Sequence, residues 1–196
     1  MNRTSILNRL ARKINAKRYL EIGAASGSNF NDVEVEYKVG VDPNPRSRNA
    51  TMGVRSDVFF ANSEEQFDLI FIDGLHKRKQ VYRDIMSSLL CLRGGGYVVC
   101  HDMNPTQEHF QVVPRVTTTW TGDSWKAWVQ IRCQRDDLFM FVVACDYGCG
   151  VITAGEQVCL ELPFWKDTTF TWDNLCENRI EWLNLLTPDE AKPFLT

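Results

Sequence analysis

The segment from Phe67 to Asp102 constrains the fold of this chain more than any other. It begins with an apolar, β-branched run that ends at Ile72, and it closes with a second apolar run from Tyr97 to Cys100. Between them, apolar residues recur three or four positions apart, which predicts one face of a helix, and Gly94–Gly96 supplies the left-handed exit that helices favour. Two buried strands joined by a crossover helix must be parallel. The helix face consists of Val81, Ile85, Leu89 and Leu92.

Both predicted strands of this segment are followed by a carboxylate. Asp73 comes directly after the first run, and Asp102 follows the second, with His101 before it. Parallel strands bring their carboxyl ends to one edge of the sheet, and open α/β folds bind their ligands at that edge. We therefore expect Asp73 and Asp102 to lie at one functional site.

The remaining sequence predicts strands that alternate with short helices, and hence a single α/β domain over residues 1–196. An amphipathic, basic stretch occupies residues 1–18; a transit peptide has a similar pattern, but this one runs directly into a strand, which favours a lid or packing helix. The capping box Thr187-Pro-Asp-Glu190 starts a last helix. We expect strands at 19–22, 39–42, 52–56, 138–144 and 151–153, and helices at 124–133 and 171–186.

Composition excludes several classes of protein. The 196 residues carry a net charge of −3, which gives no global footprint for nucleic acid. We find no apolar stretch long enough to cross a membrane and no secretion signal. The seven cysteines are odd in number and contain no C-x-x-C, so we expect a reduced, cytoplasmic protein with neither a zinc knot nor a disulfide framework.

A loop of small residues after the first strand predicts a cofactor site. Glu21, Gly23 and Gly27 form an acid-flanked G-x-x-x-G pattern, and Asp42 ends the next strand, twenty-one residues after Glu21. Small residues let backbone amides approach a ligand, and an acid at the tip of the second strand can accept the hydroxyls of a ribose. The glycine spacing differs from G-x-G-x-x-G, which makes a nicotinamide oxidoreductase the poorer fit.

Four stretches resemble the successive motifs of class I S-adenosylmethionine (SAM) dependent methyltransferases: YLEIGAASGSN, VGVDPNP, FDLIFIDGLH and LLCLRGGGYVVCHDM. The pairing of IDGxH with a later HD resembles the macrocin and mycinamicin type of metal-dependent sugar O-methyltransferase, and more distantly the catechol type. TGDSWKAW and YGCGVI resemble, more weakly, glycan-modifying methyltransferases of large DNA viruses. The resemblance implies a Rossmann-like, mostly parallel seven-stranded sheet whose last strand is antiparallel, with residues 103–137 on the acceptor side and 155–196 as a helical tail.

The resemblance also implies the residues of a cofactor site and a metal site. SAM would bind at the carboxyl edge of the sheet. A metal ion, Mg²⁺ or Mn²⁺, would bind Asp73 and Asp102. His76 would act as the general base, with Asp73 beside it. Where the macrocin type has a second acid, this chain has His101, which leaves His101 or Asn104 as the third metal ligand. Neighbours on a strand point to opposite faces, so His101 is expected to turn out of the cleft. The cofactor residues implied are Glu21, Gly23, Ala25, Gly27, Ser28, Asp42, Ser56, Asp57 and Asp73.

These patterns leave three functions open. The first is a metal-assisted O-methyltransferase that acts on a sugar or glycan, in which the metal lowers the pKa of the hydroxyl and His76 takes its proton. The second is a metal-independent or catechol-type enzyme, and the third is a non-catalytic SAM-binding scaffold. Trp120, Asp123 and Lys126 are the candidate acceptor contacts. If the acceptor is phosphorylated, Lys77–Lys79 are candidate contacts of its phosphate. The sequence does not predict the oligomeric state.

Overall fold

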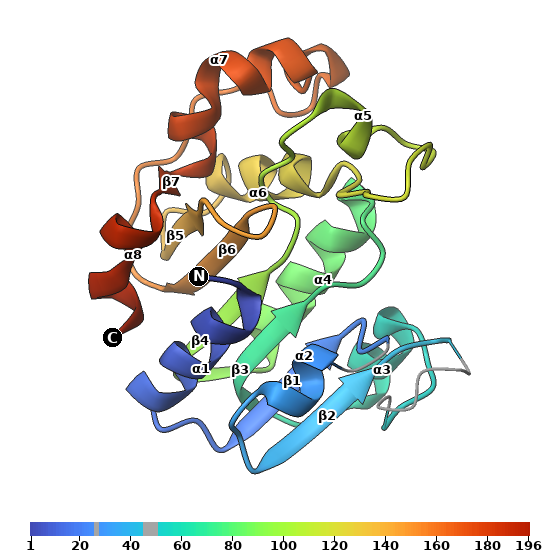
Figure 1. Cartoon of the computed structure of the whole chain (residues 1–196), viewed down its shortest axis with the longest axis vertical. Helices are drawn as coiled ribbons and strands as arrows, with labels where there is room; N and C mark the ends of the chain where they lie inside the picture. The colour runs from blue at the N-terminus through green and yellow to red at the C-terminus, as the bar shows by residue number, and fades with distance from the viewer. Residues whose placement is uncertain (26–27, 45–50) are drawn as a thin grey trace.

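The computed structural model describes residues 1–25, 28–44 and 51–196, and these residues form one sheet flanked by helices on both faces (Figure 1). Within the described part of the chain the sheet has seven strands in the order β2-β1-β3-β4-β6-β5-β7. Their bounds are β1 Arg18–Ile22, β2 Tyr37–Val41, β3 Phe67–Ile72, β4 Leu92–Cys100, β5 Leu138–Val143, β6 Cys149–Ala154 and β7 Leu185–Leu186.

The sheet is mostly parallel, as predicted. The pairs β1–β2, β1–β3 and β3–β4 are parallel. The antiparallel strand is β6, the second strand of the predicted hairpin, which lies between β4 and β5. The two residues of β7 then pair in parallel with β5 at the edge. The predicted fold class, a Rossmann-like, mostly parallel seven-stranded sheet with one antiparallel strand, is confirmed.

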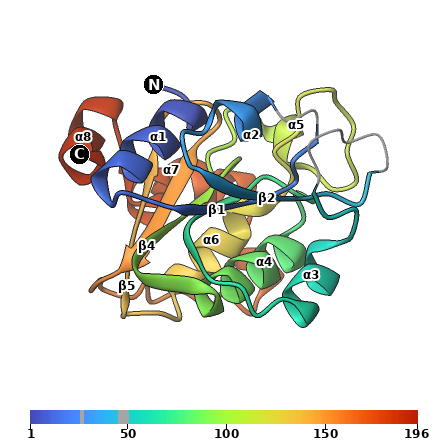
Figure 2. The same ribbon diagram turned by 90° about the horizontal axis from the view of Figure 1, so that it is seen from below.

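Two helical layers cover the sheet (Figure 2). Side chains alternate between the faces of each strand, so Tyr19 and Leu69 pack in one core while Leu20 and Ile70 pack in the other. One layer contains α1 (Arg3–Lys13), α2 (Ser28–Asp32) and α8 (Pro188–Leu195). The other contains α3 (Ser56–Asn62), α4 (Arg78–Leu90), α6 (Ser124–Arg132) and α7 (Trp172–Leu183), and α5 (Glu108–Gln111) and a 3₁₀ turn (Asp167–Thr169) lie in the connections.

Helix α1 is part of the packed structure. Asn2 and Ser5 form a reciprocal capping box at its start, and Ile6, Leu7 and Leu10 are fully buried against the sheet. The amphipathic start of the chain is thus a packing helix. Its first turn lies at the carboxyl edge of the sheet, because Arg3 contacts Asp73 there.

Three predicted boundaries were wrong. The expected strand at 52–56 is reduced to a single bridge between Val41 and Met52, and Ser56 already begins α3. Leu92 does not lie on the helix face, because α4 ends at Leu90 and Leu92 pairs with Phe67 at the start of β4, so Gly94–Gly96 lie inside a strand. The helix expected at 171–186 ends at Leu183, after which β7 forms.

Candidate active site

The carboxyl ends of β1, β2 and β3 border two neighbouring cavities. One cavity, of about 600 Å³, is lined by Asp42, Ser56, Asp57 and the residues that follow β3. The second, of about 360 Å³, is lined by Glu21, Ser28 and the first turn of α1. Gly23, Ala25 and Asp73 line both cavities. The structure therefore gathers the predicted cofactor residues at one place, except Gly27, which lies outside the described residues.

Glu21 and Asp42 are buried carboxylates that hold the loop after β1. Glu21 is 2% exposed and accepts hydrogen bonds from Tyr19 and from Asn29 on α2. Burial raises the pKa of Glu21 to about 7, against the opposing effect of these two hydrogen bonds. Asp42 accepts the backbone N–H of Ala25 at 2.7 Å, so the tip of β2 fixes the glycine-rich loop.

Gly23 allows two strand ends to approach each other. Its φ is +90°, and a Cβ built there would lie 2.1 Å from the backbone oxygen of Asp73. A side chain at this position would therefore collide with the backbone of the neighbouring β3 end. The small residue was predicted for its access to a ligand, and the structure shows a packing requirement between β1 and β3 as well.

Ser56 and Asp57 lie at the start of α3 on the far wall of the larger cavity. The side-chain amide of Gln80 donates to both of them at 3.1 Å, and Arg83 pairs with Asp57. The hydrogen bonds from Arg83 and Gln80 lower the pKa of Asp57. Helix α4 thus positions two of the predicted cofactor residues.

Asp73, His76 and Asp102 form the centre of the site. His76 Nε2 lies 3.1 Å from Asp73 Oδ1, and His76 Nδ1 lies 3.0 Å from Asp102 Oδ2. Nδ1 also lies 3.0 Å from the carbonyl oxygen of Trp120, whose ring stacks on the imidazole with centroids 5.5 Å apart. Burial disfavours the charged imidazole, but the two carboxylates outweigh it and raise the pKa of His76.

The donor set of this cluster fits a hard divalent cation. One ligand atom each from Asp73, His76 and Asp102 lie within 4.8 Å of one another. Carboxylate oxygens are the ligands that Mg²⁺ and Mn²⁺ prefer in proteins. Asp102 has φ +64°, a left-handed conformation that is strained for a residue with a Cβ. Strain of this kind is characteristic of functional sites.

His101 is buried beneath this cluster. Its side chain is 3% exposed, and Nδ1 lies 3.5 Å from Asp73 and 3.2 Å from Asp102. Nε2 points toward Asp146, at 3.5 Å, yet neither ring nitrogen has a partner in hydrogen-bonding geometry. His101 therefore does not turn away into solvent. The alternative ligand, Asn104, is outside the cluster and accepts a hydrogen bond from Arg179.

Two residues of the site were missed by the sequence analysis. The guanidinium of Arg3 donates to Asp73 at 2.7 Å and, through Nε and Nη2, to Asp146 at 2.8 and 3.0 Å. Burial opposes ionisation of Asp73, but the neighbouring imidazoles of His101 and His76 lower its pKa well below the usual range. Asp146 lies in the β5–β6 turn and Arg3 on α1, more than a hundred residues apart in sequence.

The predicted acceptor contacts Trp120, Asp123 and Lys126 lie near the start of α4. Trp120 donates its Nε1–H to the carbonyl of Val112 at 2.7 Å, which orients the ring over His76. Asp123 accepts the backbone N–H of Arg78 at 2.6 Å and so caps α4. Lys126 and Asp123 line a cavity of about 300 Å³ together with Lys77, Arg78 and Lys79. Trp120 therefore contacts His76, whereas Asp123 and Lys126 line the cavity at the start of α4, which Trp120 does not line.

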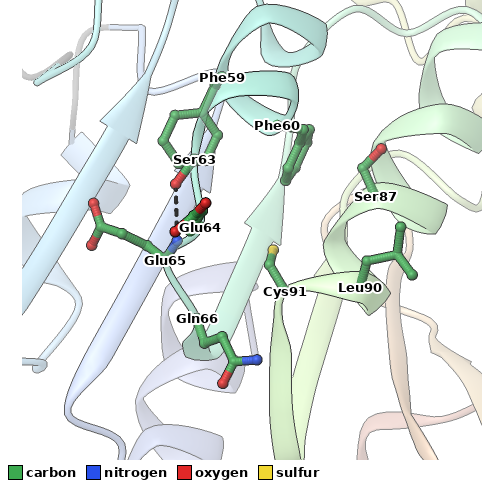
Figure 3. Close-up of a pocket in the computed structure, with 9 residues that line it drawn as sticks. All are labelled: Phe59, Phe60, Ser63, Glu64, Glu65, Gln66, Ser87, Leu90 and Cys91. Carbon is green, nitrogen blue, oxygen red and sulfur yellow. Dashed lines mark hydrogen bonds between the residues drawn. The ribbon is translucent and has the colours of Figure 1, made fainter.

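A further hollow of about 180 Å³ lies away from this chemistry. It is lined by Phe59, Phe60 and Ser63–Gln66, and by Ser87, Leu90 and Cys91 at the end of α4 (Figure 3). These residues precede β3, or lie at the end of α4 just before β4, so the hollow lies at the amino edge of the parallel strands. It contains none of the predicted site residues.

Comparisons with known proteins agree with this geometry. Residues 24–103 match the sequence profile of a family described as a methyltransferase domain. A comparison with curated protein sequences gives no match. Among solved structures, the chain is similar to the S-adenosylhomocysteine (SAH)-bound methyltransferase PaMTH1 of Podospora anserina, with 17% identity, a TM-score of 0.62 and 78% of each chain covered.

Two further structures share the fold. An O-methyltransferase from Bacillus cereus in complex with SAH has 14% identity and a TM-score of 0.55, with 79% of this chain and 80% of that chain covered. The O-methyltransferase TomG from Streptomyces achromogenes, involved in tomaymycin synthesis and solved with SAM, has 15% identity and a TM-score of 0.59, with 77% and 78% covered. The chain therefore has the fold of class I methyltransferases. Among the described residues, no helix is long and apolar enough to span a membrane.

Proposed function

We propose that this protein is a SAM-dependent O-methyltransferase that methylates a hydroxyl of a sugar or glycan with the help of a divalent metal. The observation that carries the proposal is the position of His76, which lies between Asp73 and Asp102 beside the two cavities. The methyltransferase-domain match over residues 24–103 supports the cofactor.

The cofactor assignment follows from the linings of the two cavities. Asp42 would accept the ribose hydroxyls, and Ser56 with Asp57 would border the adenine in the larger cavity. Glu21 and Ser28 would hold the amino acid end in the smaller one. When bound, SAM supplies a methyl group already activated by its sulfonium. The protein must therefore orient the acceptor and remove its proton.

His76 is the group that would accept this proton. Nδ1 faces two acceptors, the carbonyl of Trp120 and the carboxylate of Asp102, so it would keep its hydrogen. Nε2, which faces Asp73, would be the nitrogen that takes the proton of the acceptor. The neighbouring carboxylates stabilise the imidazolium, so the base is available only when their charge is compensated. A divalent metal on Asp73 and Asp102 would supply that compensation and lower the pKa of the hydroxyl. His101, whose Nδ1 lies 3.2 Å from Asp102, would orient these carboxylates for that metal.

The acceptor would lie on the side of Trp120. This ring forms one wall beside His76, and Asp123 and Lys126 border the neighbouring cavity. An aromatic ring with polar neighbours suits a sugar, and the cations Lys77 and Lys79 would suit an acceptor that carries a phosphate. A catechol is the alternative acceptor, because an aromatic ring can also stack on Trp120. We place the protein in the cytoplasm on its free cysteines.

The test combines binding with product analysis. The purified protein is titrated calorimetrically with SAM, and Asp42→Asn and Glu64→Gln are titrated in parallel. Glu64 lines the hollow at the amino edge and serves as the matched control. Mass spectrometry then follows methyl transfer to a panel of deoxyhexose glycans and catechols with Mg²⁺ or with EDTA.

Each outcome distinguishes one alternative. SAM binding that Asp42→Asn weakens and Glu64→Gln leaves intact, with a methylated glycan that EDTA abolishes, supports the proposal. Methylation that persists in EDTA supports the metal-independent enzyme. A methylated catechol would change the proposed acceptor from a sugar or glycan to a catechol. Binding without turnover on any acceptor supports a scaffold, and the absence of SAM binding rules out every form of the proposal.

A further inference from the structure

A second group of metal-ligand side chains lies beneath the candidate active site, on the face covered by α1. His101, Asp146 and Cys149 each offer one ligand atom, and these atoms lie within 4.8 Å of one another. They come from the end of β4, the β5–β6 turn and the start of β6. Strand pairing places Cys100 opposite Gly150, so the group rests on adjacent, well-packed strands.

The imidazole of His101 lacks a partner that its burial requires. The residue is 5% exposed, and neither ring nitrogen makes a hydrogen bond. Buried polar groups in native proteins almost always have a partner, and each exception needs an explanation. A cation at Nε2, between Asp146 and Cys149, would satisfy this nitrogen.

The surroundings of Nδ1 also resemble those of a metal-bound histidine. A histidine that binds a metal through one nitrogen usually donates its other N–H to a carboxylate, which fixes the tautomer and the ring orientation. Nδ1 of His101 lies 3.2 Å from Asp102 and 3.5 Å from Asp73. These two carboxylates would orient the ring through Nδ1, and Nε2 would remain for the metal.

We propose that His101 Nε2, Asp146 and Cys149 Sγ bind a transition-metal ion of the Zn²⁺ class at a site separate from the Asp73–His76–Asp102 cluster. One imidazole, one carboxylate and one thiolate form a donor set that suits Zn²⁺ and disfavours Mg²⁺. Nε2 and Asp146 Oδ1 are 3.5 Å apart, within the roughly 3.3 to 3.8 Å that separates the ligands of a tetrahedral zinc ion. With three protein ligands, the fourth position belongs to water.

The site has a route by which an ion can enter. Cys149 is fully buried and His101 nearly so, but the side chain of Asp146 is 21% exposed and that of Arg3 is 28% exposed. Arg3 covers Asp146 with two N–H groups. Because a carboxylate oxygen has two lone pairs, Asp146 can bind the ion while Arg3 stays beside it. The ion would tie β4 to the β5–β6 turn beneath the active site.

Cobalt substitution tests the proposal without relying on enzymatic activity. The full chain is reduced with a phosphine, freed of metal and titrated with Co²⁺, whose thiolate complexes have a charge-transfer absorption. We expect this absorption at one equivalent, with Zn²⁺ displacing Co²⁺. Cys149→Ser should abolish the absorption, and Asp146→Asn should weaken Co²⁺ binding by roughly 10- to 100-fold.

Matched variants separate this site from the others. Cys176→Ser removes an exposed cysteine and should leave the absorption intact, as should Cys145→Ser. His76→Ala changes the other cluster, so retention of the absorption in this variant shows that the two sites are independent. If Cys149→Ser does not fold, Asp146→Asn carries the test. No thiolate absorption in the wild type, or an absorption that both Cys149→Ser and Asp146→Asn leave unchanged, overturns the proposal and leaves His101 as an imidazolium held among carboxylates.

Discussion

Arg3 donates from Nη1 to Oδ2 of Asp73 at 2.7 Å, which places a cation from the first helix against the central carboxylate of the candidate site. The same guanidinium holds Asp146, so α1, the end of β3 and the β5–β6 turn are joined by one side chain. Arg3 also lines the smaller cavity. A cation bound at Asp73 must therefore compete with a cation that the protein itself supplies.

The substitution Arg3→Gln should have two opposite effects. It leaves Asp73 and Asp146 without their partner, and because the pair is only partly exposed we expect a loss of about 1 to 3 kcal/mol in the free energy of unfolding. It also removes a competitor, so the affinity for Mn²⁺ should rise several-fold. Urea unfolding and Mn²⁺ titration measure the two effects.

Arg12→Gln is the control for this prediction. Arg12 lies on the same helix and pairs with Glu34, but both side chains are more than half exposed, so the loss should not exceed about 1 kcal/mol. Equal destabilisation by the two variants, or unchanged Mn²⁺ affinity in Arg3→Gln, would show that Arg3 is an ordinary surface cation.

Gly23→Ala should destabilise the protein strongly. The new Cβ would lie 2.1 Å from the backbone oxygen of Asp73, and the φ of +90° is unfavourable for alanine. Since neither the backbone of β3 nor that of β1 can move without breaking the parallel pairing, we expect a loss of about 3 kcal/mol or more. Thermal and urea unfolding measure it.

The matched control is Gly94→Ala, at an exposed position where an added Cβ meets nothing within 4 Å. This variant should change the stability by less than about 0.5 kcal/mol. A mild effect of Gly23→Ala, similar to that of the control, would mean that the ends of β1 and β3 are less closely packed than the structure describes.

The fold and half of the site could be predicted because they depend on local patterns. Apolar runs fixed the strands, and the strand-end positions of Asp42, Asp73 and Asp102 followed from them. The strand predicted near Met52 does not form, because so short a segment does not specify whether it will pair with β2 over more than the single bridge to Val41. Leu92 was assigned to the helix because helix and strand patterns overlap where the two elements adjoin.

The other half of the site depends on tertiary contacts that no local pattern encodes. Arg3 and Asp146 meet across 143 positions of the sequence, and a basic amphipathic helix gives no sign of which cation faces inward. The sequence signal was the Asp146-Tyr147-Gly148 turn between two predicted strands, and in the structure all three residues have positive φ values. Strand alternation predicted that His101 would point away from the cleft. Its side chain does point to the other face of the sheet, but α1 and Asp146 cover that face, so His101 is buried there.

Glu21 should make the stability of the protein depend on pH near neutrality. Its pKa rises from 4.5 in the unfolded chain to about 7 in the folded one, chiefly because it is buried. The contribution of this group is fully present below pH 4.5 and is lost as the pH rises through about 7, with an upper limit of roughly 3 kcal/mol. Glu21→Gln should remove this part of the pH dependence, as measured by urea unfolding between pH 4.5 and 8.

Comparison with the wild type isolates Glu21 from other groups. The pKa values of His76 and His101 are also raised, so they add losses of stability above pH 6.5, but these should persist in the variant. If the pH profiles of Glu21→Gln and wild type run parallel, Glu21 is ionised throughout the range.

Asp102→Asn should separate metal binding from folding. The φ of +64° at this position is tolerated by asparagine better than by most residues, so the variant should fold with a loss of no more than about 1 kcal/mol. The carboxylate that neighbours His76 at 3.0 Å becomes an uncharged amide, so Mn²⁺ affinity and the methyltransferase rate should both fall by 10-fold or more, while SAM affinity stays unchanged. Asp102→Ala is the contrasting variant, because alanine lacks the side-chain hydrogen bonds that support a left-handed backbone and should unfold at lower urea. If the folded Asp102→Asn variant binds Mn²⁺ as tightly as the wild type, the metal does not bind at this edge of the sheet. The catalytic role of His76 would then have to be explained by Asp73 alone.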